Sequence, residues 1–299
     1  MKITLVLGGG GARGLAHVGV LKALEKTDVE IERIIGCSFG AIVGGMYAQN
    51  PDAAAVEDRL YSFFNSAQFD SLGLHLLRKK SVMTDDYFQQ LSQSVKDWLM
   101  MNVVARRSSL LKSERLQEAV RFLINEGDIQ DTQIPFFCNA TDLVSGDPYL
   151  FQEGDIQTAI TASSTIPGYF PPVIMEDKKL VDGAVTSTLP TRFARTFNAG
   201  FVVAVDVRPE LHPEEDYSNV LEVILRAGAI TAQSRAEEQI YSPDVLVSPA
   251  IKEYYWYEFD RFREMINAGE EAMVREIHRI PRQRIPRTRT LQRFLGIST

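Results

Sequence analysis

The chain has 299 residues, of which 45% are hydrophobic, and it carries a formal net charge of −7. This length and composition suit a single sizeable enzyme domain, and the two cysteines, Cys37 and Cys138, exclude a disulfide-bonded scaffold. No stretch approaches the roughly 18 consecutive apolar residues of a transmembrane helix, and Met1 leads straight into a predicted strand instead of a signal peptide.

The N-terminal segment predicts a strand, a glycine-rich loop and a helix. Residues 3–7 form a short apolar run typical of a buried strand, and residues 8–14 are mostly glycine. Apolar residues at helical spacing follow from Leu15 to Leu24. Successive N–H groups at a helix N-terminus can bind a phosphate or a transient oxyanion. The candidate donors are Gly9, Gly10 and Gly11.

The same loop also fits a dinucleotide-binding pattern, because Gly9, Gly11 and Gly14 spell G-x-G-x-x-G. That pattern requires an acidic residue at the end of the second strand to hold a ribose. Glu30 and Glu32 stand too early in that strand. Nucleotide binding therefore remains a weaker alternative, beside a third in which the loop is only a tight turn.

A G-x-S-x-G motif follows the second predicted strand. It covers residues 36–40 and lies between an apolar run at 29–35 and a small-residue helix pattern at 41–48. A serine in this context is typical of a nucleophile elbow, in which a sharp turn exposes the hydroxyl at the top of a sheet. We expect Ser38 to be the nucleophile and Cys37 to be a small packing residue. Gly36 and Gly40 would allow the strand and helix to approach closely.

A third motif, Val181-Asp182-Gly183-Ala184, follows a short apolar strand far downstream. Acyl transfer needs a nucleophile, a base and donors for the oxyanion, so Asp182 is the candidate base for Ser38. In order and context, the glycine loop, the elbow and this motif resemble the patatin-like phospholipase family over roughly residues 1–210. Segments 139–143 and 162–173 add to the resemblance. The supporting motif residues are Arg13, Gly14, Gly36, Gly40, Gly183 and Ala184.

The resemblance implies a three-layer α/β/α sandwich with a mainly parallel central sheet, and a Ser–Asp dyad that needs no histidine. None of the four histidines lies in a motif, and we expect His17 to be a buried structural residue. Aspartate is a weak base, so we expect burial to raise the pKa of Asp182. Asp142 and Asp206 are rival bases.

Organisation along the chain predicts a catalytic domain at 1–250 and a helical, basic extension at 251–299. Residues 52–130 form a helical excursion that could supply a lid or an acyl pocket. Its candidate lining residues are Phe63, Phe64, Phe69, Leu72, Leu74, Leu76 and Leu77, although ordinary helix packing would also explain them. Predicted helices cover 53–64, 85–101, 113–126, 156–163, 219–240 and 254–279, and predicted strands cover 134–140, 148–151, 179–182, 201–206 and 244–248.

The sequence therefore predicts a cytoplasmic, bacterial lipid acyl hydrolase that cleaves carboxylic esters through an acyl-serine, with no metal or cofactor. The alternative is a regulatory or lipid-binding protein on the same fold with little turnover. Residues 275–299 contain seven arginines and one glutamate, so this tail could contact an anionic membrane or the acidic body of the protein. We expect no nucleic-acid partner, and the sequence does not set the oligomeric state.

Overall fold

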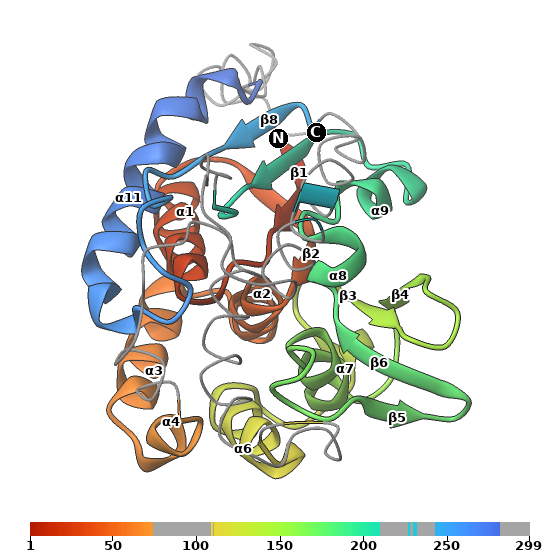
Figure 1. Ribbon diagram of the computed structural model, residues 1–299. Coiled ribbons are helices and arrows are strands. Elements are labelled where there is room, and N and C mark those ends of the chain that lie inside the picture. The colour runs from red at the N-terminus through yellow and green to blue at the C-terminus, as the bar shows by residue number, and fades with distance from the viewer. Residues whose placement is uncertain (74–108, 110, 210–226, 228–229, 232–242, 282–299) are drawn as a thin grey trace, which may run out of the picture.

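The computed structural model describes residues 1–73, 109, 111–209, 227, 230–231 and 243–281. Within this part, an eight-stranded sheet forms the centre of the molecule (Figure 1). Its strands are β1 (Lys2–Leu7), β2 (Glu30–Cys37), β3 (Phe136–Asp142), β4 (Pro148–Phe151), β5 (Val173–Met175), β6 (Lys178–Asp182), β7 (Val202–Val205) and β8 (Val245–Val247).

The strand order is β5-β6-β3-β2-β1-β7-β8, and β4 pairs with β3 outside this path. Strands β3, β2, β1, β7 and β8 are parallel to one another. The β3–β4, β3–β6 and β5–β6 pairs are antiparallel. Parallel strands place their carboxyl ends at one edge, so the segments after β1 and β2 meet there.

The helices are α1 (Ala16–Glu25), α2 (Phe39–Gln49), α3 (Ala53–Phe64), α4 (Ala67–Ser71), α6 (Ser113–Leu123), α7 (Ile156–Ser163), α8 (Ala184–Ser187), α9 (Thr191–Thr196) and α11 (Phe262–Glu276). A 3₁₀ turn at Gly11–Leu15 precedes α1, and further 3₁₀ turns lie at Ile129–Asp131, Phe259–Arg261 and Ile277–Arg279. The helix predicted at 85–101 and most of that at 219–240 lie outside the described residues. None of the described helices is long and apolar enough to cross a membrane.

Two hydrophobic cores lie on opposite faces of the sheet. Successive side chains of a strand alternate between faces, and β1 shows this directly. Leu5 and Leu7 belong to a large core with residues of α1, α2 and α11, whereas Val6 belongs to a smaller core with Phe193 of α9. Figure 1 shows α1 and α11 on one side of β1 and α9 on the other. The predicted α/β/α sandwich is therefore confirmed.

Helix α11 packs against α1 at very short range. A Cβ added to Gly19 would overlap the Ile266 carbonyl oxygen, and one added to Gly269 would overlap the Ala16 carbonyl oxygen. Met265 and Met273 of α11 are fully buried. The described part of the predicted C-terminal extension therefore shares the large core with residues of α1, α2 and β1.

The start of that extension differs from the prediction, because the helix begins after the aromatic cluster and not within it. Residues 254–258 form turns, with a 3₁₀ turn and then α11 following. The Tyr254 carbonyl accepts a hydrogen bond from Arg13 Nη1 at 2.8 Å, and the Trp256 carbonyl accepts from Ala12 N at 2.7 Å. These carbonyls accept hydrogen bonds from residues of the glycine loop. They are therefore not the acceptors of a helix that begins at residue 254.

Candidate active site

Ser38 occupies the sharp turn between β2 and α2. Its φ of 52° and ψ of −123° lie outside the usual regions for a residue with a side chain, a strain that often marks a functional site. A Cβ on Gly36 would lie 2.5 Å from the Ala41 Cα, and one on Gly40 would overlap the Leu7 carbonyl oxygen. Both glycines are therefore needed where strand and helix approach, as the motif predicts.

The side chain of Ser38 meets that of Asp182, which ends β6. Ser38 Oγ donates a hydrogen bond to Asp182 Oδ2 at 2.6 Å. The second carboxylate oxygen, Oδ1, accepts from the Ala184 N–H at 2.8 Å, which fixes the plane of the carboxylate. The two residues lie 144 positions apart in the chain, and the fold brings them into direct contact.

Burial changes the acid–base chemistry of Asp182. The residue is only 1% exposed, and desolvation of its charged form raises the pKa from 3.8 to about 6. The hydrogen bonds from Ser38 and Ala184 act in the opposite direction, but they are weaker than the desolvation. A carboxylate with this pKa is a stronger base than an ordinary aspartate and is still largely ionised at neutral pH.

The C-terminal end of α7 and the residues that follow it contact both residues. Ser163 Oγ accepts from the Ser38 N–H at 3.0 Å. The Ser163 carbonyl accepts from the Gly183 N–H at 3.4 Å, and the Thr165 carbonyl accepts from the Asp182 N–H at 2.8 Å. A single short segment therefore sets the position of Ser38 relative to Asp182.

The glycine loop lies beside Ser38, as the sequence predicts. A Cβ on Gly9 would lie 3.3 Å from the Ser38 Cβ, so this glycine permits close approach. The Gly9 N–H, however, donates to the Thr188 carbonyl at 2.9 Å. This donor is engaged within the protein, which leaves the N–H groups of Gly10 and Gly11 as the candidates for an oxyanion hole.

Close packing explains why the next two loop positions are glycine. A Cβ on Gly10 would lie 2.7 Å from the Val207 carbonyl oxygen. Gly11 has a φ of 60°, and a Cβ there would lie 2.5 Å from the Trp256 carbonyl oxygen. Side chains at either position would push the loop away from the segments that follow β7 and β8.

The Arg13 side chain links the glycine loop to the segments that follow β7 and β8. The side chain is fully buried, and its Nε donates to the Val207 carbonyl at 3.1 Å and its Nη1 to the Tyr254 carbonyl at 2.8 Å. Gly14 serves a different purpose, because a Cβ there would lie 2.6 Å from Cδ1 of Phe39, the residue after Ser38. These two motif residues thus position the loop and the elbow.

Close packing also explains why the residue after Asp182 is glycine. A Cβ on Gly183 would lie 2.5 Å from Asn139 Nδ2. That amide nitrogen donates to the carbonyls of Gly183 and Ser187, at 3.2 and 3.0 Å. The segment that follows Asp182 is therefore hydrogen-bonded to β3, and Ala184 supplies the N–H that orients the Asp182 carboxylate.

His17 and Cys37 are buried residues that take no part in the hydrogen bond between Ser38 and Asp182. His17 is fully buried, its Nε2 is 2.8 Å from the Gly8 carbonyl oxygen, and burial lowers its pKa to about 4. A neutral imidazole that donates to Gly8 is the buried structural residue that we predicted. Burial raises the pKa of the Cys37 thiol well above its ordinary value, so the thiol stays protonated and packs as expected.

The two rival bases have other partners. Asp142 ends β3 and accepts from the N–H groups of Val144 and Lys179, and these bonds lower its pKa. Asp206 forms two bonds with the Arg208 side chain, at 2.8 and 2.7 Å. Both carboxylates are engaged by other groups, which leaves Asp182 as the carboxylate in contact with Ser38.

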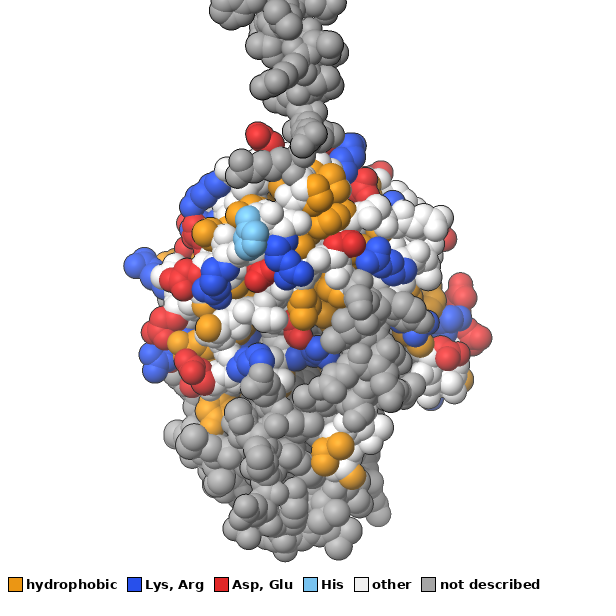
Figure 2. Space-filling model, turned by 90° about the horizontal axis from the view of Figure 1, so that it is seen from above, with side chains coloured by type: hydrophobic (Ala, Val, Ile, Leu, Met, Phe, Trp, Pro, Cys, Tyr) orange, Lys and Arg blue, Asp and Glu red, His pale blue; other side chains and the backbone are white. Residues whose placement is uncertain are grey.

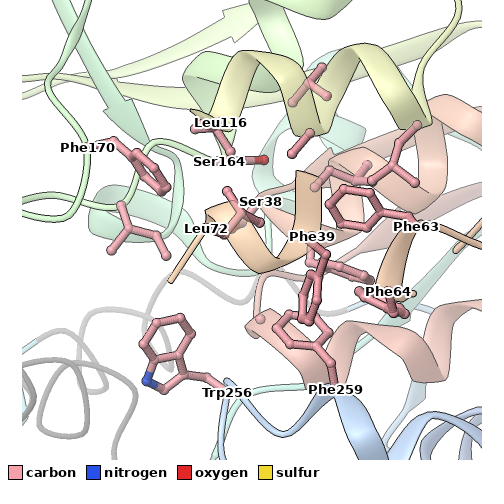
Figure 3. Close-up of a pocket in the computed structure, with 17 residues that line it drawn as sticks. Ser38, Phe39, Phe63, Phe64, Leu72, Leu116, Ser164, Phe170, Trp256 and Phe259 are labelled. Carbon is pink, nitrogen blue, oxygen red and sulfur yellow. The ribbon is translucent and has the colours of Figure 1, made fainter. Parts of the chain in front are cut away.

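Ser38 opens into an apolar cavity of about 680 Å³, counted with its mouth. Figure 3 shows aromatic rings from α2, α3 and the segment before α11 around it. Four of the predicted lining residues, Phe63, Phe64, Phe69 and Leu72, line this cavity, and Leu74, Leu76 and Leu77 lie outside the described residues. The remaining lining residues are Gly11, Phe39, Ile42, Leu116, Ala119, Val120, Leu123, Ser164, Ile166, Phe170, Trp256 and Phe259.

A family model described as patatin-like phospholipase matches residues 5–195, which span the glycine loop, the elbow and Asp182. The chain belongs to the patatin-like phospholipase family. This membership confirms the resemblance that the ordered motifs indicate.

Relatives of this patatin-like protein include longer chains. An uncharacterised NTE family protein of Mycobacterium tuberculosis is 32% identical over 72% of this chain and 52% of that protein. Lysophospholipase NTE1 of Mycosarcoma maydis is 33% identical over 69% of this chain and 10% of that protein. The solved structure of VipD from Legionella pneumophila gives a TM-score of 0.46 at 11% identity, over 93% of this chain and 66% of that chain. The chain thus spans at most about half the length of these two sequence relatives.

Several residues of this patatin-like site were not predicted as functional. Ser163 and Ser164 lie in a segment that contributed to the resemblance, but no role was predicted for them. Paired serines at the end of a helix pattern, shortly before the Asp182 strand, were the available signal. Trp256 and Phe259 join the cavity from more than 200 residues beyond Ser38, and no local pattern indicates that contact.

Proposed function

We propose that this protein is a serine lipid acyl hydrolase that cleaves carboxylic esters of phospholipids, lysophospholipids or related lipids. The observation that carries the proposal is the 2.6 Å contact between Ser38 Oγ and a buried Asp182, with Ser38 lining an apolar cavity. A cavity lined mainly by aromatic and aliphatic side chains suits an acyl chain. Family membership and a relative named lysophospholipase support the same chemistry.

The mechanism follows from the dyad. Ser38 Oγ attacks the ester carbonyl carbon while its proton passes to Asp182 Oδ2. The N–H groups of Gly10 and Gly11 stabilise the negative charge on the carbonyl oxygen. As the tetrahedral intermediate collapses, Asp182 returns the proton to the departing alkoxide, and acyl-Ser38 remains. Water then attacks the acyl group in the same way and releases a fatty acid.

The raised pKa of Asp182 sets the expected pH dependence. The base must be ionised to accept the serine proton, and its pKa is about 6. Turnover should therefore rise with pH through about 6 and level off above about 7. This limb should be absent from the residual activity of Asp182→Asn.

A fluorophosphonate probe together with a soluble p-nitrophenyl acyl ester tests the proposal. The wild-type protein should react covalently at Ser38, and Ser38→Ala and Asp182→Asn should each lower hydrolysis by about 10³-fold or more. Asp206→Asn is the matched control, because it removes a rival carboxylate, and it should keep most of the activity.

Two results would contradict the proposal. A folded wild-type protein that binds lipid but neither reacts with the probe nor hydrolyses esters would favour the regulatory or lipid-binding alternative. Loss of activity in Asp206→Asn with retention in Asp182→Asn would show that the base is assigned to the wrong residue.

A further inference from the structure

Ser164 lies at the point where the two halves of the dyad are braced. Its neighbours in the chain bind the main chain of Ser38 and of Asp182 through Ser163 Oγ and the Thr165 carbonyl. Ser164 itself caps the C-terminus of α7, and its N–H is bound to the Ile160 carbonyl at 3.0 Å. The main chain of Ser164 is therefore fixed, and its side chain is directed toward the cavity.

The hydroxyl of Ser164 is buried without a partner. The residue is 7% exposed, and across the described part of the chain its Oγ has no hydrogen-bond partner. Ser164 lines the same cavity as Ser38 (Figure 3). A buried hydroxyl normally has a partner, because leaving it unpaired costs free energy. An unpaired hydroxyl beside a nucleophile is thus available to a ligand.

Apart from main-chain groups such as the Gly11 N–H, the rest of the cavity wall has few groups that can bind a polar ligand atom. Among the described lining residues, only Ser38, Ser164 and Trp256 have a polar side-chain atom. The Trp256 indole nitrogen points away from Ser38 in Figure 3. The hydroxyl of Ser164 is therefore the polar side-chain group that accompanies the nucleophile inside the cavity.

We propose that the Ser164 hydroxyl donates a hydrogen bond to the ester group of the acyl substrate, an inference that rests on the proposed hydrolase function. An acyl chain that fills the cavity displaces water and brings no polar atom apart from its ester oxygens. Once the acyl chain covers the Ser164 hydroxyl, the ester group of the substrate is the acceptor that this hydroxyl can reach. The bond would hold the carbonyl carbon in reach of Ser38 Oγ, so Ser164 would act in substrate binding and orientation.

Ser164→Ala is the direct test, measured as hydrolysis of a p-nitrophenyl acyl ester beside a melting curve. We expect kcat/KM to fall about 5- to 50-fold, as for the loss of one hydrogen bond in a water-excluded site. The melting temperature should stay the same or rise, because the variant removes a hydroxyl that has no partner within the described part of the protein. Ser164→Thr keeps the hydroxyl and should recover most of the lost kcat/KM.

Two control variants separate this role from a structural one. Thr4 in β1 also has a buried hydroxyl with no partner in the described part of the chain, and it does not line the cavity, so Thr4→Val should leave kcat/KM unchanged. Ser163→Ala removes a hydroxyl that binds the Ser38 N–H, so its melting temperature should fall together with its activity.

The outcomes are distinct for the two proposals. Ser164→Ala with wild-type kcat/KM overturns the role of Ser164 and leaves the hydrolase function standing. Ser164→Ala that loses activity only with a fall in melting temperature, as in Ser163→Ala, also overturns it. A wild-type protein with neither probe labelling nor hydrolysis overturns the hydrolase function, and with it the ester as the ligand of Ser164.

Discussion

In the proposed mechanism, the buried side chain of Asp182 serves chemistry at the expense of stability. A dyad has no histidine to accept the serine proton, so the carboxylate itself must be basic enough. Burial achieves this by disfavouring the ionised form, which raises the pKa to about 6. The same effect means that the ionised aspartate destabilises the folded state at neutral pH.

The stability of Asp182→Asn should reveal how much the buried, ionised aspartate destabilises the folded state. The folded pKa, about 6, lies above the ordinary 3.8, so between these two values the folded state binds more protons than the unfolded state. Stability from this group therefore falls as pH rises across that window, by no more than about 3 kcal/mol for a shift of about two pKa units. The asparagine of the variant does not titrate. Urea unfolding should find the variant more stable than wild type at about pH 8, and the gain should shrink toward about pH 4.

Asp142→Asn is the matched control with the opposite sign. Hydrogen bonds from the Val144 and Lys179 N–H groups lower the pKa of Asp142, so its ionised form stabilises the fold above about pH 4. This variant should lose stability at neutral pH. If Asp182→Asn also loses stability at alkaline pH, the buried aspartate does not carry the predicted cost.

At this scale, prediction from sequence succeeded where local geometry imposes a residue type. The G-x-S-x-G motif predicts the elbow because Gly36 and Gly40 leave room that no other residue could leave. Ser164 was missed because its role depends on which groups surround it. An unpaired hydroxyl is a property of the folded structure, and the sequence only shows a serine.

At the scale of elements, helix α11 is the part of the fold that the sequence described least well. Its start was placed too early, since the carbonyls before it bind the glycine loop. Its close contact with α1 was not predicted either. Glycines in helices usually weaken them, and only the approach of two helix backbones explains Gly19 and Gly269.

Gly269→Ala tests that contact. The added methyl group would overlap the Ala16 carbonyl oxygen, and that oxygen belongs to the backbone of α1 and cannot turn aside. The helices would have to separate, so we expect the free energy of unfolding, measured in urea, to fall by about 3 kcal/mol or more. This loss should outweigh the stabilisation that replacing a helical glycine by alanine usually gives.

Gly200→Ala provides the control for that variant, since a Cβ there would meet nothing within 4 Å. Its stability should stay within about 0.5 kcal/mol of wild type. Because α1 follows the glycine loop directly, Gly269→Ala should also lower ester hydrolysis. Wild-type stability in Gly269→Ala would show that α11 is not tied to α1 as closely as the structure has it.

At the scale of the whole molecule, the uneven charge is the feature with functional consequences. The arginine-rich tail at 275–299 lies largely outside the described residues. On the face shown in Figure 2, basic and acidic side chains of the described residues are interspersed, and no single-sign surface dominates that face. By sequence, residues 275–299 carry seven arginines and one glutamate, so the positive charge that could attract an anionic bilayer is concentrated in the tail.

Deletion of residues 282–299 tests whether the tail recruits the protein to lipid. It removes five arginines and no acidic residue, while Ile280, which is 3% exposed, stays in the core. Each arginine near an anionic surface can contribute about 1 kcal/mol, so we expect weaker co-sedimentation with phosphatidylserine vesicles. The difference should fade with added salt, because exposed charges are screened over about 10 Å at 0.1 M. Hydrolysis of a soluble ester should be nearly unchanged, since the dyad lies elsewhere. Unchanged vesicle binding with a lower melting temperature would mean instead that the tail docks on the acidic body of the protein.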